Sequence, residues 1–259
     1  MKLCFISPIN NLGDISDEGD ILFCLARQAK EFPKYKDFFV KNGKPILFDN
    51  SVHEDERISD DEFVELAIEM KVTELIIPDV MKEGEETLRI SKQFLDKYHS
   101  ELKQHNIKTV GVIQGKKMSE ITKCFSYLNN DSRVDYLALP FDLIPYSFVE
   151  ERNLNQMMNR ILILQTLSSG YKIKKQIHCL GLNLLLEIKI LDAFPMIRSC
   201  DSKILTRLAL CNIKLDEENW QFAIKPTRKM DFYDELTLEQ IKINKDNIKF
   251  LKEQLVKTK

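Results

Sequence analysis

Polar side chains that could do chemistry follow several short apolar runs of this sequence, at the point where each run ends. Carboxylates or a carboxamide come directly after four of these runs, and they are Asp49, Asp79, Gln114 and Asp201. Such groups can read the hydrogen-bond donors of a purine edge, transfer protons, or attack a glycosidic carbon. Each Asp also has an ordinary explanation as a turn residue or helix N-cap, and Asp201-Ser202 ahead of a helical pattern is the clearest case.

The elements that must position these side chains alternate along the chain. The apolar runs are 3–7, 45–48, 74–78, 109–113, 135–139, 176–182 and 195–200, and helical periodicity occupies 19–31, 60–70, 83–104, 117–128, 150–168, 184–192 and 202–211. Short, fully apolar strands separated by helices are typical of a parallel sheet covered on both faces. Their number approaches the eight strands of a (β/α)8 barrel, in which all strand ends meet at one mouth.

We therefore predict an α/β fold, a (β/α)8 TIM-type barrel with one irregular or missing strand. Residues 220–224 (WQFAI) are a candidate for the eighth strand, and the first strand region around SPINNLGDIS is the other place where it could be hidden. From about residue 236 to 257 the pattern predicts an amphipathic C-terminal helix with a Lys-rich face. No linker or longer repeat interrupts the chain, so residues 1–259 are predicted to form a single domain.

Composition narrows the class of protein. The net charge of -2 and the 30% of charged residues are globular values that neither require nor exclude a nucleic-acid partner. No apolar run has the ~20 residues of a membrane span, and the N-terminus lacks a secretory core. The histidines and cysteines show no metal-site spacing, so we expect no metal and no other cofactor. A cytoplasmic protein with reduced thiols and no membrane partner is predicted.

Five strings, in order, resemble motifs of the tRNA-guanine transglycosylase superfamily. They are ILFDNS, IIPDV, GVIQGK, CLGL and SCDS, and they extend with their surroundings over about residues 3–211. The helical segment LARQAKEFPKYKDFFVKNGK ahead of the first string is similar to the compact phage relatives that modify DNA with 7-deazaguanine bases. The resemblance implies a barrel enzyme that exchanges guanine in a polynucleotide for a free 7-deazaguanine base, such as 7-cyano-7-deazaguanine.

The resemblance also implies roles for individual residues. Asp201 matches the nucleophile that attacks C1′, and Asp49 matches the general acid/base. The residues that match or adjoin the family's base-binding positions are Asp79, Gln114, Gly115, Gly181, Asn50 and Ser51. A carboxylate nucleophile gives a covalent glycosyl-enzyme, and a second carboxylate is needed because a purine leaves poorly without proton transfer.

Several motifs of the transglycosylase family are missing or changed in this sequence, and these differences affect the expected substrate. The tRNA enzymes carry a Cys-x-Cys-x-x-Cys…His zinc site near the C-terminus, whereas here the last Cys is Cys211 and the last His is His178. The absence of that site favours DNA over tRNA, and the location would be the host cytoplasm if the protein is phage-encoded. A Gly-Gly-Leu segment of the family is replaced by ALPFD (138–142), and the family's Pro-Thr-Arg after the nucleophile is replaced by SKIL.

Basic residues near the proposed mouth are candidates for contacts with a nucleic-acid backbone, because each neutralised phosphate releases counterions. They are Arg198, Lys203, Arg207 and Lys116, and solvated surface positions are the alternative. A further cluster holds Lys225, Arg228 and Lys229. His178 lies inside a predicted strand, where a core position is favoured over a catalytic one because alternation can point it away from the barrel axis.

Other functions remain open at this level. A tRNA-guanine transglycosylase, a carboxylate-dependent glycoside or nucleoside hydrolase, and a non-catalytic transglycosylase partner subunit all fit a barrel with these strand ends. A transferase needs a pocket for the incoming base, which Asp79 and Gln114 would supply, whereas a hydrolase needs an ordered water.

Overall fold

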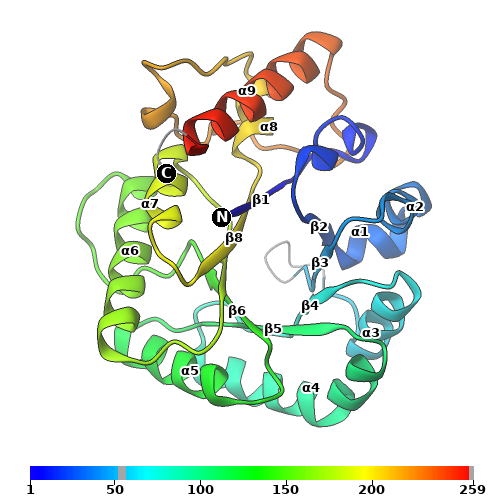
Figure 1. Cartoon of the computed structure of the whole chain (residues 1–259), viewed down its shortest axis with the longest axis vertical. Helices are drawn as coiled ribbons and strands as arrows, with labels where there is room; N and C mark the ends of the chain where they lie inside the picture. The colour runs from blue at the N-terminus through cyan, green and yellow to red at the C-terminus, as the bar shows by residue number, and fades with distance from the viewer. Residues whose placement is uncertain (52–56, 257–259) are drawn as a thin grey trace.

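The computed structural model describes residues 1–51 and 57–256 and has the predicted barrel. Eight parallel strands within these residues form one sheet that curves into a ring (Figure 1). The strands are β1 (Lys2–Phe5), β2 (Leu22–Leu25), β3 (Ile46–Asp49), β4 (Glu74–Ile76), β5 (Lys108–Val112), β6 (Tyr136–Pro140), β7 (Ile177–Leu180) and β8 (Ile197–Ser202). The fold class predicted from the sequence is therefore confirmed.

The ring is nearly closed, and its seam lies between β1 and β2. The strand order is β1-β8-β7-β6-β5-β4-β3-β2, so β1 pairs with β8, with Lys2 opposite Ser199. Asp20, just ahead of β2, connects the two sides of the seam. Its backbone N–H donates to the Leu3 carbonyl at 2.8 Å, and its carboxylate accepts from the Leu3 N–H at 2.9 Å. These hydrogen bonds replace part of the strand pairing that is missing between β1 and β2.

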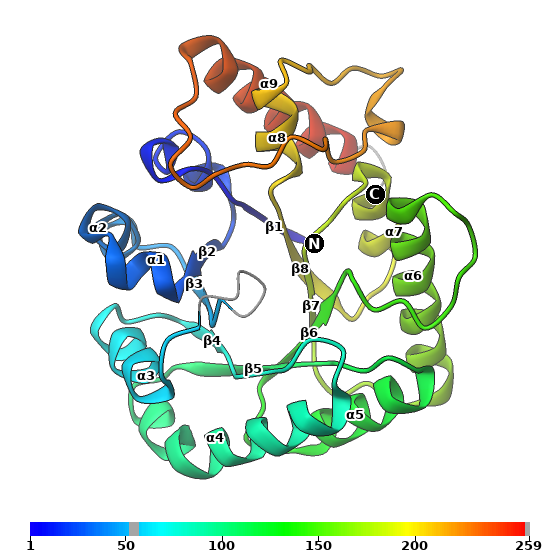
Figure 2. The same ribbon diagram turned by 180° about the vertical axis from the view of Figure 1, so that it is seen from behind.

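Helices surround the ring, as the view from behind also shows (Figure 2). They are α1 (Ala26–Glu31), α2 (Pro33–Asn42), α3 (Asp60–Glu69), α4 (Gly84–Gln104), α5 (Met118–Asn130), α6 (Arg152–Gly170), α7 (Leu185–Asp192), α8 (Ile204–Leu210) and α9 (Leu238–Val256). The 3-10 turns in the described residues are η1 (Ile9–Asn11), η2 (Ser16–Glu18) and η4 (Trp220–Phe222). The C-terminal helix predicted over 236–257 is α9, and residue 257 lies outside the described residues.

The eighth strand is not where the sequence placed it. Residues 22–25 were predicted to be part of a helix over 19–31, but they form β2, and the helix begins only at Ala26. All four residues of β2 are buried, because a strand inside the barrel wall is covered on both faces. The alternative segment 220–224 is a 3-10 turn followed by a single antiparallel bridge from Ile224 to Leu184.

The helical segment that precedes Asp49 is divided in two. Phe32 has φ -120° and ψ 100°, which ends α1, and Pro33 opens α2. The residue before a proline is pushed out of the α region, and proline is well suited to the first helical position. Gly43, at φ 80°, then ends α2 in the left-handed conformation and lets the chain turn into β3.

An ion pair fills the end of the barrel where the strands begin. Arg198, near the start of β8, donates to both carboxylate oxygens of Glu74 at 2.9 and 2.6 Å, and its guanidinium lies 4.0 Å from the centroid of the Tyr136 ring. Glu74 and Tyr136 are the first residues of β4 and β6. The structure therefore removes Arg198 from the predicted nucleic-acid contacts, because its charge is already paired at the end opposite the mouth.

None of the helices in the described ranges combines the length and the apolar character that a membrane crossing would need.

Candidate active site

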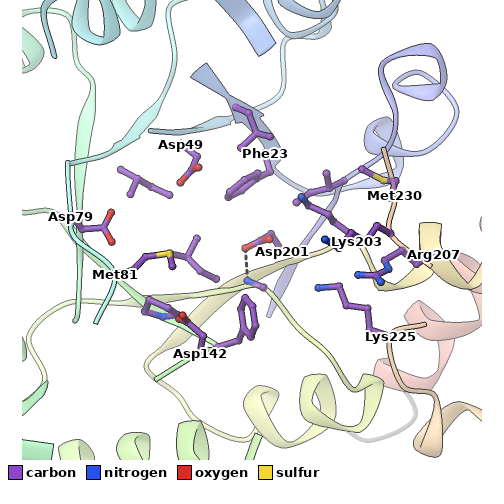
Figure 3. Close-up of a pocket in the computed structure, with 18 of the residues that line it drawn as sticks. Phe23, Asp49, Asp79, Met81, Asp142, Asp201, Lys203, Arg207, Lys225 and Met230 are labelled. Atoms are coloured by element: carbon purple, nitrogen blue, oxygen red, sulfur yellow. Dashed lines mark hydrogen bonds between the residues drawn. The ribbon is translucent and has the colours of Figure 1, made fainter. Parts of the chain in front are cut away.

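A cavity of about 400 Å³ opens where the strands end, and its size lies in the range of small-molecule sites. Its polar lining includes the predicted residues Asp49, Asp79, Gln114, Gly181 and Asp201, together with Asp142, Lys203, Arg207, Lys225 and Lys229. Figure 3 shows Asp49 and Asp79 to one side of Asp201, and Lys203, Arg207 and Lys225 to the other. The carboxyl ends of the strands thus bring together Asp49 and Asp201, which lie 152 positions apart.

Asp201 is part of a strand and does not cap a helix. It lies within β8, and α8 starts after Lys203 without a side-chain cap. Its Oδ1 accepts hydrogen bonds from His178 Nε2 at 3.1 Å and from the Gly181 N–H at 2.9 Å. Burial alone would raise the pKa of Asp201, but these two donors, together with electrostatic attraction from His178 and Lys225, outweigh burial, so the pKa of its carboxyl lies below the ordinary value. An ionised carboxylate is the form that can act as a nucleophile.

Asp49 is the last residue of β3, and the next two residues support the site from outside the cavity. The Ser51 N–H donates to Asp49 Oδ2 at 2.9 Å, and Ser51 holds a left-handed φ of 61° to do so. Asn50 Nδ2 donates to Asp79 Oδ1 at 3.2 Å and to the Ile77 carbonyl at 3.4 Å. Asn50 and Ser51 do not line the cavity. They position two carboxylates, whereas the sequence predicted that they bind the base.

Asp79 and Gln114 form one hydrogen-bonded unit. Gln114 Nε2 donates to Asp79 Oδ2 at 2.7 Å, and Gln114 Oε1 accepts from the Lys82 N–H at 2.8 Å. Burial raises the pKa of Asp79, and the hydrogen bonds from Asn50 and Gln114 offset only part of this effect. The helix after β4 is capped at Glu83, so Asp79 is not an N-cap either. Each oxygen keeps a further lone pair that can accept from a ligand.

The two predicted glycines have different neighbours. Gly181 has φ 65°, and a Cβ there would lie 2.6 Å from Cδ1 of Phe141, so the aromatic ring requires a glycine. Gly115 has φ 154°, and a Cβ there would lie 2.8 Å from the Ile121 N. Gly115 does not line the cavity. It allows the chain to turn tightly into α5, which places Gln114.

A set of cations forms one wall of the cavity. Lys203 and Arg207 come from the region of α8 that the sequence singled out, and Lys225 and Lys229 arrive from the segment after η4. Burial and the neighbouring Lys203 and Arg207 lower the pKa of Lys225 to about 8. Among the described residues, no carboxylate lies within 4.0 Å of the charged nitrogens of Arg207, Lys225 or Lys229. Mutual repulsion of this kind favours binding of an anion.

Hydrogen bonds hold the segment that carries Lys225 and Lys229 against the barrel. Arg207 Nε donates to the Arg228 carbonyl at 2.6 Å, and Arg228 donates in turn to the Leu210 carbonyl. Lys225 Nζ donates to Asn183 Oδ1 at 3.0 Å. Lys116, the remaining predicted backbone contact, is exposed near the mouth but pairs with Glu83 and does not line the cavity.

Apolar side chains complete the cavity, and the sequence analysis did not identify them. They are Ile6, Phe23, Leu25, Ile76, Met81, Pro140, Phe141, Leu180 and Met230. Phe23 lies in β2, within the range 19–31 for which the sequence predicts a helix, so its place at a strand could not be foreseen. Phe141 follows the apolar run 135–139 directly, so the rule that strand ends carry function could have found it. An apolar lining that includes the rings of Phe23 and Phe141, beside carboxylates, suits a planar heteroaromatic ligand.

His178 occupies the core position that the sequence favoured, but its contact with the site was not predicted. It is 1% exposed, as expected of a core position, yet it contacts Asp201 directly. His178 in β7 pairs with Ser199 in β8. Ser199 and Asp201 are two residues apart on the same strand, so the side chains of His178, Ser199 and Asp201 lie on the same face of the sheet.

No three His, Cys, Asp or Glu side chains lie close enough together to hold a metal ion in the described part of the chain. A search of protein-family models and of curated proteins found no match to this chain.

Proposed function

We propose that this protein is a base-exchange transglycosylase that replaces guanine in DNA with a free 7-deazaguanine base. The observation that carries the proposal is the order of groups across the cavity: carboxylates and a carboxamide on one side, Asp201 in the middle, and cations on the other. A nucleotide has the same order, with its base, its C1′ carbon and its phosphate.

The nucleophile is Asp201. Its carboxylate attacks C1′, a C1′–O bond forms, and the C1′–N9 bond breaks with its electron pair passing to the leaving guanine. Asp49, at the end of β3, delivers a proton to that base, which makes it a better leaving group. In the second half, N9 of the incoming base attacks C1′, the bond to Asp201 breaks, and Asp49 takes the N9 proton. Two displacements retain the configuration at C1′.

The base is held by the Asp79–Gln114 unit. A guanine or 7-deazaguanine edge presents N–H donors and a carbonyl acceptor, which match the free lone pairs of Asp79 and the amide of Gln114. A water molecule would need no such flat, polar-edged site, so this unit favours base exchange over hydrolysis. The 7-cyano form is the first base to test, because nothing in the described lining requires a charged substituent.

The cationic wall supports a polynucleotide substrate. A nucleoside carries no phosphate, so a nucleoside hydrolase has no use for Lys203, Arg207, Lys225 and Lys229 beside its nucleophile. The target nucleotide has to leave the base stack, because a cavity lined by strand ends cannot admit a duplex. The cations of this wall then hold the phosphate that follows it.

The test is a base-exchange assay with radiolabelled guanine and with 7-cyano-7-deazaguanine. Wild-type protein, Asp201→Asn, Asp49→Asn and the matched control Asp37→Asn, an exposed position on α2, are each incubated with guanine-containing DNA and with tRNA. Incorporation into DNA by the wild type and by Asp37→Asn, but not by the two active-site variants, is expected.

Other outcomes point to other functions. Release of guanine without incorporation would identify a hydrolase. Incorporation into tRNA alone would make the DNA assignment wrong. Activity in Asp201→Asn at the wild-type level would remove the nucleophile from the proposal, and inactivity of all proteins on both substrates would favour a non-catalytic partner subunit.

A further inference from the structure

A buried hydrogen-bond chain stands behind Asp201, on the side away from the cavity. Ser199 Oγ lies 2.8 Å from His178 Nδ1, and His178 Nε2 lies 3.1 Å from Asp201 Oδ1. Ser199 and His178 are each 1% exposed, and neither lines the cavity. The chain therefore cannot touch a substrate, and any effect it has on a reaction has to pass through Asp201.

The hydrogen-bonding capacities of Asp201 and Ser199 indicate which nitrogen of the His178 imidazole carries the hydrogen. An ionised carboxylate only accepts hydrogen bonds, so His178 Nε2 carries the hydrogen. In the neutral ring Nδ1 is then an acceptor, and the Ser199 hydroxyl supplies its donor. The Phe23 ring stacks on the imidazole with centroids 6.3 Å apart and planes at 17°, which holds the ring in this orientation.

A second donor reaches the same oxygen. The Gly181 N–H donates to Asp201 Oδ1 at 2.9 Å, and Arg160 keeps that turn in place by donating to the carbonyls of Leu180 and Gly181 at 3.0 and 2.8 Å. No described residue donates a hydrogen bond to Oδ2 of Asp201. The two oxygens of the carboxylate are thus unequal, with Oδ1 held from behind and Oδ2 left for the cavity.

We infer that His178 is a positioning residue that makes Oδ2 the attacking oxygen and assists the departure of Asp201 in the second displacement. The inference rests on the proposed function. In the covalent intermediate Oδ2 is bonded to C1′ and Oδ1 is the carbonyl oxygen of an ester. When the incoming base attacks C1′, the C1′–Oδ2 bond breaks, its electron pair passes to the carboxylate, and negative charge returns to Oδ1.

The donors on Oδ1 bind the carboxylate more strongly than the neutral ester, so they favour the second displacement. A hydrogen bond to a charged group is worth about 1.5–3 kcal/mol, and 1.36 kcal/mol is tenfold in rate. Loss of the His178 donor is therefore expected to slow release of the DNA from Asp201 by roughly 10- to 100-fold. Formation of the bond is not expected to slow for this reason, because a less stabilised carboxylate is a stronger nucleophile.

The experiment measures the lifetime of the protein–DNA adduct. Guanine-containing DNA is incubated with wild type, His178→Leu, His178→Gln, and the matched control His105→Leu, which lies at the exposed end of α4. Free guanine is removed, 7-cyano-7-deazaguanine is added, and the decay of the adduct that resists denaturation is followed. Glutamine is the conservative variant because its amide can donate from near the position of Nε2.

The expected pattern separates positioning from folding. His178→Leu should give an adduct that decays about 10- to 100-fold more slowly, with kcat reduced by a similar factor and KM for DNA unchanged. His178→Gln should recover most of the rate, and His105→Leu should match the wild type. Unfolding midpoints identify any variant that is destabilised, and the Gln variant decides the question if the Leu variant does not fold.

Two results would overturn the inference alone. One is a wild-type decay rate in His178→Leu, and the other is a folded His178→Gln as slow as His178→Leu. Absence of both adduct and base exchange in the wild type would instead refute the proposed function, and this inference with it. The two failures are therefore distinguishable.

Discussion

The pH dependence of nucleic-acid binding is predicted to reside in Lys225. Its pKa of about 8 results from burial and from the cations of Lys203 and Arg207, with Asp201 acting in the opposite direction. A phosphate bound against the cationic wall would offset the repulsion and return the pKa towards its ordinary value of about 10.4. Binding of the polynucleotide is therefore accompanied by proton uptake at any pH at which Lys225 of the free protein is deprotonated.

The magnitude follows from the titration. A group with a pKa of about 8 is about 90% protonated at pH 7 and about 10% protonated at pH 9, whereas the bound form stays protonated across this range. Affinity for a polynucleotide is expected to fall about tenfold from pH 7 to pH 9, which corresponds to about 1.4 kcal/mol. Below pH 7 Lys225 is fully charged in the free protein as well, so the affinity for the polynucleotide no longer changes with pH.

The assay is fluorescence anisotropy with a single-stranded oligo-deoxyadenylate, which contains no guanine and so undergoes no exchange. Lys225→Arg is the matched control, because arginine stays charged throughout this range and should give a level profile. Lys225→Met should bind weakly at every pH. Equal slopes in wild type and Lys225→Arg would show that another group takes up the proton, and a level wild-type profile would refute the reasoning.

Further predictions concern single contacts. Arg198→Met should destabilise the fold by about 3–5 kcal/mol in denaturant titration, since it leaves the Glu74 carboxylate buried without a partner, and the double variant with Glu74→Gln should recover part of the loss. Gly181→Ala should lower kcat by at least tenfold in the exchange assay, because its Cβ would overlap Phe141; a fully active variant would contradict the close approach. Gln114→Ala should raise KM for the incoming base by roughly 10-fold and leave the Kd for oligo-deoxyadenylate unchanged, whereas equal losses in both would indicate a general structural role.

The sequence was sufficient for the barrel and for its polar strand ends. Parallel strands finish at one mouth whatever their details, so Asp49, Asp79, Gln114 and Asp201 could be grouped from their position after apolar runs alone. The one strand that was missed, β2, continues directly into α1, and a short buried run next to a helix has no periodicity of its own to reveal it.

Contacts between distant segments could not be predicted in the same way. His178 faces Asp201 because it lies opposite Ser199, and the register shifts at Ile177 and His178, which no pattern within one strand reports. Lys225 lies in the segment after η4 and not at a strand end, and its Nζ donates to Asn183 Oδ1. Its role depends on tertiary packing that composition and spacing do not encode.

The strand order also has a consequence for folding during translation. In the described structure β1 has its strand partner only in β8, about 200 residues further along the chain. At about 5–20 residues per second, the first strand would wait roughly 10–40 s for its neighbour to be translated. Its apolar residues Leu3, Cys4 and Phe5 form an unpaired edge during that time, of the kind that attracts other chains. Slow codons anywhere between β1 and β8 lengthen this interval and would therefore be expected to increase aggregation.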